Sequence, residues 1–123
     1  MRTAKMAVNG QEHLLCFSAR VVRACTERYG GVERISDVLS DQDTVKVLDE
    51  SLWILAAMMD AGDRYAKLNG LENPPPLSCD ALYDAMGMED FAGLQGKIAE
   101  TIRSGRETHV EVEPGKNGEA TQG

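Results

Sequence analysis

Residues 44–68 carry the longest amphipathic pattern in the chain, and this segment limits the possible folds more than any other feature. Apolar side chains recur along it at spacings of three and four residues: Val45, Leu48, Leu52, Leu55 and Met59. Further apolar residues widen this stripe beyond the ~100° that a surface helix presents to a core. The pattern predicts one long helix at the centre of the core, ended by Gly70 and by three prolines at 74–76, which lack amide donors.

Residues 4–17 show the pattern of a β-hairpin. Asn9-Gly10, the dipeptide best suited to the two positive φ angles of a type I′ turn, stands between two runs rich in apolar residues. Alternation along the second run predicts two faces, with His13, Leu15 and Phe17 on one and Leu14 and Cys16 on the other. Because a two-stranded ribbon is only marginally stable alone, we expect one face to lie on helices.

The remaining elements are expected to be shorter helices, at about 19–29, 33–39, 79–86 and 89–104. Ser18 and Ser78 stand at N-cap positions, and Gly30-Gly31 ends the helix over 19–29, in which Arg28 faces water. Gly93 weakens the last helix by up to ~1 kcal/mol relative to Ala.

Together these elements predict a mainly α fold of the α+β class. An N-terminal β-hairpin packs on about four to five helices in a single globular domain, residues 1–107, which suits a chain of 123 residues. Residues 108–123 are expected to form an extended or disordered tail, because after a strand-like alternation at 109–113 almost nothing could be buried.

The composition argues against several classes of function. Twenty Asp and Glu against thirteen Lys and Arg give a net charge of −7, and no basic cluster is long enough to bind a nucleic-acid backbone. The most apolar window, residues 52–59, is far shorter than the ~20 residues that span a bilayer, and we expect no signal peptide. The three cysteines have no CxxC spacing and are expected to be reduced thiols in a cytosolic protein.

No motif in the sequence carries recognisable catalytic or cofactor chemistry. His13 and Cys16 would point to opposite faces of a strand, where they cannot share a metal, and His109 is far away in the sequence. Asp41 and Asp43 lack the glycine and the terminal glutamate of a calcium loop. We therefore expect no enzyme, no cofactor and no metal, but an interaction protein whose six methionines suit surfaces that repack against partners.

The order of these parts resembles that of a known family. A hairpin at 6–15 leads to a helix that ends in ERYGG at 27–31, then to the long apolar helix, the segment LYDAMG at 82–87 and a final amphipathic helix. This layout, over roughly residues 5–105, is similar to the tail assembly chaperones of long-tailed, siphovirus-type bacteriophages, as found in phages and prophages of Gram-positive hosts. The prolines at 74–76 depart from the pattern of many relatives.

The resemblance implies a non-catalytic role in the cytoplasm of the bacterial host cell. Such chaperones bind the tape measure protein through helices, recruit tail tube subunits around it and are absent from, or dispensable in, the finished virion. Self-association is compatible with this role. In the family, a longer product commonly arises when ribosomes slip back one base near the end of the short reading frame. Gly115-Lys116 is a dipeptide that such a slippery stretch would encode.

Amphipathic client helices need apolar grooves, so the helical stripes indicate where a client would bind. We expect part of the 52–59 face and the 91–102 stripe to be exposed for the client. The predicted protein-binding residues are Leu52, Leu55, Met59, Phe91, Leu94, Ile98 and Ile102. The net charge of −7 would keep a protein with such grooves in solution.

Two other functions are alternatives to the chaperone. One is a head–tail or tail completion protein that forms a ring in the virion, which would be a stable oligomer present in purified particles. The other is a small acidic regulator that occupies a basic surface of its partner. The regulator would place its acids in one contiguous stripe, whereas in this sequence they are spread over every expected helix.

Overall fold

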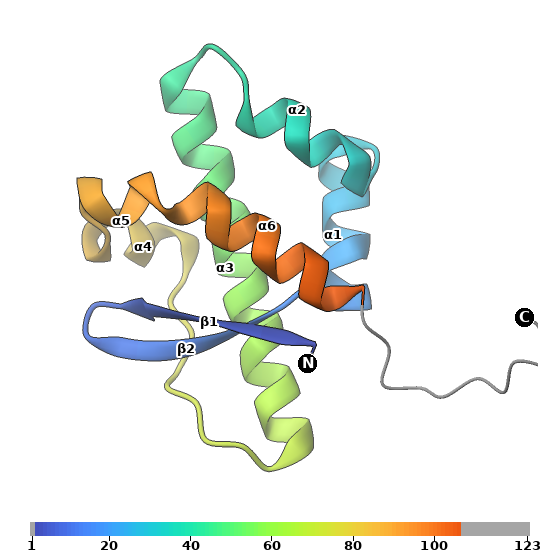
Figure 1. The fold of residues 1–123 in the computed structure, drawn as a ribbon, viewed down its shortest axis with the longest axis vertical. Helices are drawn as coiled ribbons and strands as arrows, with labels where there is room; N and C mark the ends of the chain where they lie inside the picture. Colours follow the sequence, from blue (N-terminus) through green and yellow to red (C-terminus); the bar gives the residue numbers. More distant parts are fainter. Residues whose placement is uncertain (1, 107–123) are drawn as a thin grey trace, which may run out of the picture.

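The structure, a computed structural model, describes residues 2–106 and confirms the expected fold class, an N-terminal antiparallel hairpin followed by helices (Figure 1). The strands are β1 (Thr3–Val8) and β2 (Gln11–Cys16). The helices are α1 (Ala19–Tyr29), the 3₁₀ helix η1 (Val32–Arg34), α2 (Ile35–Leu39), α3 (Thr44–Asn69), α4 (Cys79–Ala85), α5 (Met88–Ala92) and α6 (Leu94–Gly105). The expected tail, with its strand-like residues 109–113, lies outside the described residues.

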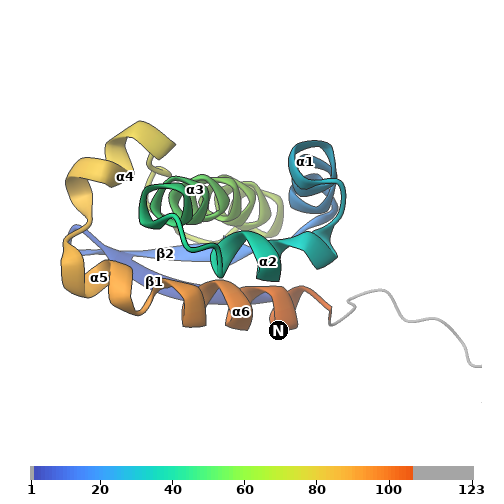
Figure 2. The same cartoon turned by 90° about the horizontal axis from the view of Figure 1, so that it is seen from above.

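The hairpin lies between two layers of helices. Figure 2 shows α3 with α1 and α4 on one side of it and α5 with α6 on the other, and α3 contacts β2 while α6 contacts both strands. We expected helices on one face, but both faces are covered. All five residues at 13–17 are buried, because the second strand is apolar on both of its faces and burial removes that surface from water.

The hairpin turn has the expected type I′ geometry. Asn9 and Gly10 both have positive φ angles, 53° and 80°, and Val8 pairs with Gln11 on either side of the turn. Because the twist of this turn matches that of the strands, the pairing continues in register to the other end of the hairpin, where Thr3 lies opposite Cys16.

Helix α3 approaches β2 closely because a glycine stands where they cross. A Cβ atom added at Gly62 would overlap the carbonyl group of Leu14, so glycine alone allows this contact between two backbones. Leu55, Met58 and Met59 on the same helix are fully buried. The segment with the longest apolar pattern is thus the central helix of the core, as its sequence predicts.

The ends of α3 agree with the sequence signals. The Asp43 carboxylate accepts hydrogen bonds from the amides of Val45 and Lys46, at 3.1 and 3.2 Å. Gly70 follows the last turn in the left-handed conformation, with φ of 68°. Both devices use backbone groups that a helix leaves unpaired at its ends.

The serine caps differ from each other. Ser78 accepts a hydrogen bond from the amide of Ala81 at 3.1 Å and caps α4 as predicted. Ser18 stands at the N-cap of α1, but its side chain makes no cap hydrogen bond there. Gly30 ends α1 with a φ of 93°, so the predicted C-terminal signal of this helix is confirmed.

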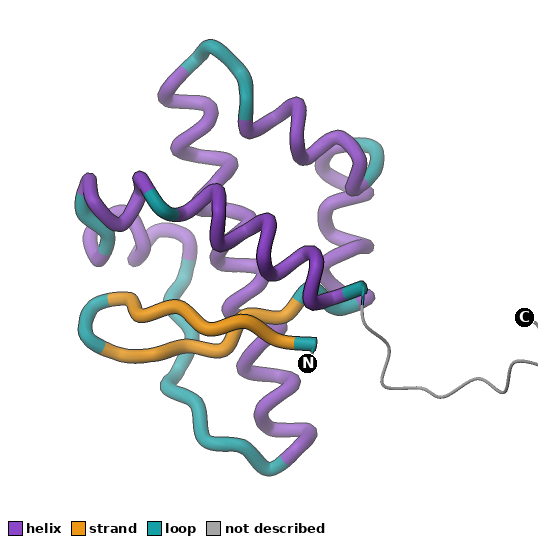
Figure 3. Tube along the Cα trace, in the orientation of Figure 1, coloured by secondary structure: helices purple, strands orange, loops and turns teal. Residues whose placement is uncertain are grey.

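The single helix expected over 89–104 is two helices in the structure, with a short non-helical segment between them (Figure 3). The helix expected over 33–39 begins with a 3₁₀ turn. The break falls at Gly93, whose low helix propensity lets the chain change direction (φ −93°, ψ −2°). The short helix before it starts where the Asp90 carboxylate accepts a hydrogen bond from the amide of Gly87 at 2.9 Å. As a result, Phe91 and Leu94 belong to different helices.

Candidate functional site

Five of the seven predicted protein-binding residues are buried inside the folded chain. Leu52, Leu55, Met59, Leu94 and Ile98 are each at most 2% exposed. The prediction that they form an open surface for a client is therefore wrong. Much of the apolar surface of α3 and α6 covers the two faces of the hairpin, and a periodic stripe looks the same whether it faces its own core or a partner.

The other two predicted residues are half-buried and open onto two different grooves. Ile102 lies in a shallow groove between α2 and α6, together with Ile35, Leu39 and Ala99. Phe91 lies in a groove of about 300 Å³ among α3, α4 and α5. We call the latter the α3–α4–α5 groove, and its lining residues are Thr44, Leu48, Leu52, Leu82, Tyr83, Met86, Gly87, Met88 and Phe91.

Local contacts hold the walls of the α3–α4–α5 groove in place. The Tyr83 hydroxyl donates a hydrogen bond to Asp49 Oδ1 at 2.5 Å and ties α4 to α3. This bond to a carboxylate, together with burial, raises the pKa of Tyr83 to about 12, so the phenol stays protonated as the donor. Gly87 and Asp90 shape the turn between α4 and α5 through the hydrogen bond described above.

The groove is apolar inside and has an exposed methionine at its mouth. Leu52 and Leu82 form a fully buried floor, whereas the Met88 side chain is 89% exposed and Tyr83 is 42% exposed. Methionine is flexible and polarizable, so Met86 and Met88 can adjust to the shape of an apolar group that enters. This arrangement suits the insertion of a side chain from a partner and offers few polar groups to orient a small polar ligand.

The segments that frame the groove carry nearly all of the net negative charge. Residues 40–49 and 78–91 hold seven Asp and Glu and one lysine, Lys46. The other described residues hold nine Asp and Glu and eleven Lys and Arg. Acids do occur on every helix, as expected, but among residues 2–106 the excess of acids over bases lies in these two segments.

Three of these acids are free to meet a partner. Asp80, Asp84 and Glu89 are exposed, and within residues 2–106 they make no hydrogen bond or ion pair. The other four have local roles: Asp41 pairs with Lys46 at 3.5 Å, Asp43 caps α3, Asp49 accepts the Tyr83 hydroxyl and Asp90 starts α5.

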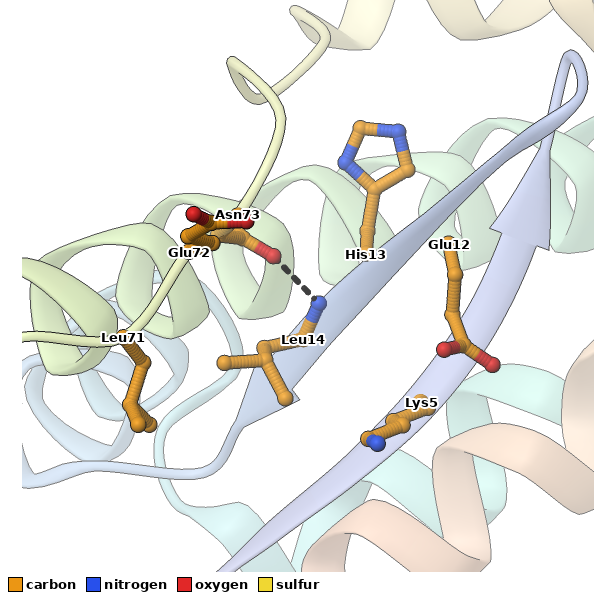
Figure 4. Close-up of a pocket in the computed structure, with 7 residues that line it drawn as sticks. All are labelled: Lys5, Glu12, His13, Leu14, Leu71, Glu72 and Asn73. Atoms are coloured by element: carbon orange, nitrogen blue, oxygen red, sulfur yellow. Dashed lines mark hydrogen bonds between the residues drawn. The ribbon is translucent and has the colours of Figure 1, made fainter.

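A second pocket, of about 250 Å³, lies along the outer edge of β2 (Figure 4). Asn73, in the loop after α3, accepts a hydrogen bond from the Leu14 amide on its Oδ1 atom at 2.8 Å. Its Nδ2 atom lies 3.3 Å from Asp63 Oδ1 and 3.2 Å from the carbonyl oxygen of Pro74, and donates to them. This side chain pairs a backbone amide at a strand edge that would otherwise be unsatisfied.

His13 lines this second pocket but does not form a catalytic group there. It is 1% exposed, and neither of its ring nitrogens has a hydrogen-bond partner. Burial lowers the pKa of His13 from 6.5, and the charge of Asp63 opposes this shift. In Figure 4 the His13 ring points away from the charged ends of Lys5 and Glu12, so these titratable groups do not converge on one point.

The cysteines are not activated either. Burial raises the pKa of Cys25 to about 11 and also raises the pKa values of Cys16 and Cys79, so all three are protonated thiols at neutral pH. Across residues 2–106, no three His, Cys, Asp or Glu side chains are close enough together to hold a metal ion.

Sequence reasoning missed a charged cluster that joins α1 to α3. Arg28, expected to face water, binds both carboxylate oxygens of Glu50, with Nε donating at 2.7 Å and a terminal nitrogen at 3.1 Å. The Tyr29 hydroxyl donates to the same carboxylate at 2.7 Å, and the Arg28 guanidinium lies 4.5 Å from the ring centre of Trp53. Since the Glu50 carboxylate accepts three hydrogen bonds inside the cluster and ties α1 to α3, we interpret the cluster as structural.

The comparisons with known proteins add no relative: no family model matches the sequence, and neither a curated protein nor a solved structure gives a significant match. The resemblance described above therefore depends on the quoted residues and their order. Within the described part of the chain, no helix has the length and apolar content needed to cross a membrane.

Proposed function

We propose that this chain is a non-catalytic binding protein that holds an apolar helix of a partner in the α3–α4–α5 groove. In this proposal it is a tail assembly chaperone of a long-tailed bacteriophage or prophage and acts in the cytoplasm of the bacterial host cell. Its partners are the tape measure protein, which it binds through helices, and the tail tube subunits that it recruits. The observation that carries the proposal is the apolar groove with Met88 exposed at its mouth.

Two further observations support this proposal. A helix-binding protein needs a groove that accepts side chains spaced by three and four residues, and the groove lies where three helices meet. In addition, the hairpin, the ERYGG helix end and the long apolar helix follow one another in the order that resembles the chaperone family. None of the three pockets and grooves described above gathers side chains suited to acid–base or nucleophilic catalysis.

The acidic regulator is the second candidate, because the unbalanced acids gather around one groove. A regulator would bind the basic surface of a folded partner, whereas a chaperone would keep an aggregation-prone chain in solution. A ring-forming virion component is the third candidate, and it would remain in the finished particle. The three functions therefore differ in whether the protein keeps its partner in solution and in whether it remains in the finished particle.

The test is co-expression with the tape measure protein encoded in the same genome, followed by measurement of the soluble fraction of that protein. We expect the wild-type chain to raise this fraction. We expect Met88→Asp to remove most of the effect, since it places a charge at the mouth of the apolar groove. The matched control is Leu68→Asp: Leu68 is 85% exposed and lies outside the groove, near the far end of α3.

Several results would contradict the proposal. A wild-type chain that leaves the tape measure protein insoluble would reject the chaperone role. Equal losses with Met88→Asp and Leu68→Asp would reject the groove as the binding site. Finding the chain in purified virions at a fixed copy number would favour the ring-forming component instead.

A further inference from the structure

The charges around the α3–α4–α5 groove indicate what kind of helix can bind there. We propose that the occupant is a basic amphipathic helix, which inserts apolar anchors into the groove and places Lys or Arg side chains against its acidic rim. This inference rests on the proposed function, because it names the partner chemistry of the same groove. Its test is nevertheless independent of the phage assignment.

The free carboxylates stand next to groove-lining residues in the sequence of α4 and α5. Asp80 and Asp84 are four residues apart on α4, so they are neighbours on its surface, and like charges at this spacing destabilise a helix. Asp84 follows Tyr83 of the groove lining, and Glu89 follows Met88 at its mouth. All three are exposed without an ion pair within the described residues. Cations brought by a partner would relieve this repulsion.

The apolar interior limits the size of what enters. A volume of about 300 Å³ is at the lower end of the range for small-molecule sites, ~300–1,000 Å³. Leu48, Met86 and Phe91 form half-buried walls above the floor of Leu52 and Leu82. The groove therefore has room for one or two large side chains, as presented by a helix at positions i and i+3 or i+4.

Two other occupants fit the charges or the anchors less well. Residues 107–123 of the same chain carry four Glu and one Lys, so the acidic rim would repel them. A second copy of the chain could offer α1, which carries three arginines, but Val22 is its one exposed large apolar side chain in the structure described here. A separate basic helix with two apolar anchors satisfies both the rim and the groove.

The test uses two synthetic peptides of ~18 residues, long enough to become helical on binding. They share one apolar face of Leu and Met, and their polar faces carry Lys and Arg in one peptide and Glu in the other. Dissociation constants are measured by calorimetry with the full-length chain. The rim variant is Asp80→Lys with Asp84→Lys and Glu89→Lys. The matched control, Glu12→Lys with Asp37→Lys and Glu72→Lys, changes the net charge equally from exposed positions outside the groove.

We expect the basic peptide to bind the wild-type chain and the acidic peptide to bind at least about tenfold more weakly. The rim variant should lose about tenfold or more in affinity for the basic peptide, while the control should lose less than about threefold, because distant charges are screened by salt. Met88→Asp should also weaken binding of the basic peptide, since the anchors need the apolar groove.

Equal binding of both peptides, or equal losses with both triple variants, would overturn the inference. So would self-association of the wild-type chain that Met88→Asp abolishes, because a second copy would then be the occupant. If the rim variant still keeps the tape measure protein in solution, the proposed chaperone role stands, and the inference that the occupant is a basic helix is wrong. If the basic peptide binds as expected but the tape measure protein stays insoluble, the inference of a basic helix is upheld and the proposed role in phage tail assembly is wrong.

Discussion

At the scale of single residues, His13 shows that burial lowers the pKa of a side chain. The sequence does not reveal which groups surround this side chain in the fold. Alternation along β2 placed His13 on the same face as Leu15 and Phe17, and all three are buried. The sequence does not show that both ring nitrogens would lack a hydrogen-bond partner. A polar group left unpaired in a core costs ~1–3 kcal/mol, and the protonated ring would cost more than the neutral one.

This burial predicts a pH-dependent stability. Because the pKa of His13 in the folded chain is below its value of 6.5 in the unfolded chain, the unfolded state binds the proton more readily. The free energy of unfolding should therefore be highest above pH 6.5 and should fall as the pH drops below 6.5 toward the lowered pKa. Urea unfolding at pH 7.5 and at pH 5.5 measures the difference.

The matched variant for this prediction is His13→Met, which fills a similar volume and cannot take up a proton. The fall in stability between the two pH values should be smaller in His13→Met than in the wild-type chain. Asp63, whose pKa is lowered mainly by its hydrogen bond with Lys67, stays charged over this range and does not add to the fall. An unchanged fall in the variant would show that other groups cause it.

At the scale of elements, the crossing of α3 over β2 depends on one residue without a side chain. The backbones meet at Gly62 and Leu14, and a Cβ atom at Gly62 would overlap the Leu14 carbonyl group. In an isolated helix an alanine is better than a glycine by up to ~1 kcal/mol. At this crossing the overlap outweighs that preference, since the two elements would have to move apart and lose packing.

We expect Gly62→Ala to lower the free energy of unfolding by at least ~1–3 kcal/mol, which is the usual cost of placing extra atoms in a packed core. Gly96→Ala is the control, because a Cβ atom at Gly96 on α6 would meet nothing within 4 Å. Gly96→Ala should raise the stability by up to ~1 kcal/mol. Urea midpoints of the two variants should shift in opposite directions, and shifts in the same direction would contradict the close contact.

The break between α5 and α6 is a second feature at this scale. A glycine with low helix propensity marks the place in the sequence, but propensity alone does not decide between a weakened helix and a broken one. The tertiary contacts decide it, because Phe91 lines the α3–α4–α5 groove while Leu94 is fully buried. One straight helix would keep the direction of these two side chains fixed relative to each other.

At the scale of the whole molecule, the hairpin ties the two helical layers together. α3 covers one side and α6 the other, so neither layer can leave without exposing buried strand residues to water. We therefore expect the described part of the chain to unfold in one step. Trp53, on α3 next to α1, should report the same transition by fluorescence as far-UV circular dichroism does.

A core substitution in α6 should lower the stability of the whole molecule and not only of its last helix. Ile98→Ala removes a side chain that is 1% exposed and should cost ~2–5 kcal/mol. Ile102→Ala, at a half-buried position one turn further on, should cost less. In both variants the fluorescence and dichroism transitions should still coincide. Separate transitions would show that α6 can detach while the rest stays folded.

The sequence by itself determined the elements, because the causes of their formation are local. The Asn9-Gly10 turn, the Asp43 cap and the glycine at position 70 act within a few residues, and the 3.6-residue period predicts α3 directly. The same kind of local signal located α4, since Ser78 stands at its start, whereas α5 was predicted only as part of a single helix over 89–104.

Only the tertiary structure decided which apolar faces remain open. A stripe such as that of α6 predicts burial, but whether it is buried by the chain itself or by a partner depends on the other elements that compete for it. The hairpin covers most of the stripes of α3 and α6, so the opening lies at the part of the α3 stripe that includes Leu48, together with Met86 and Met88. Asp49 comes to lie beside α4 and its acids for the same reason, because folding brings together segments that are far apart in the sequence.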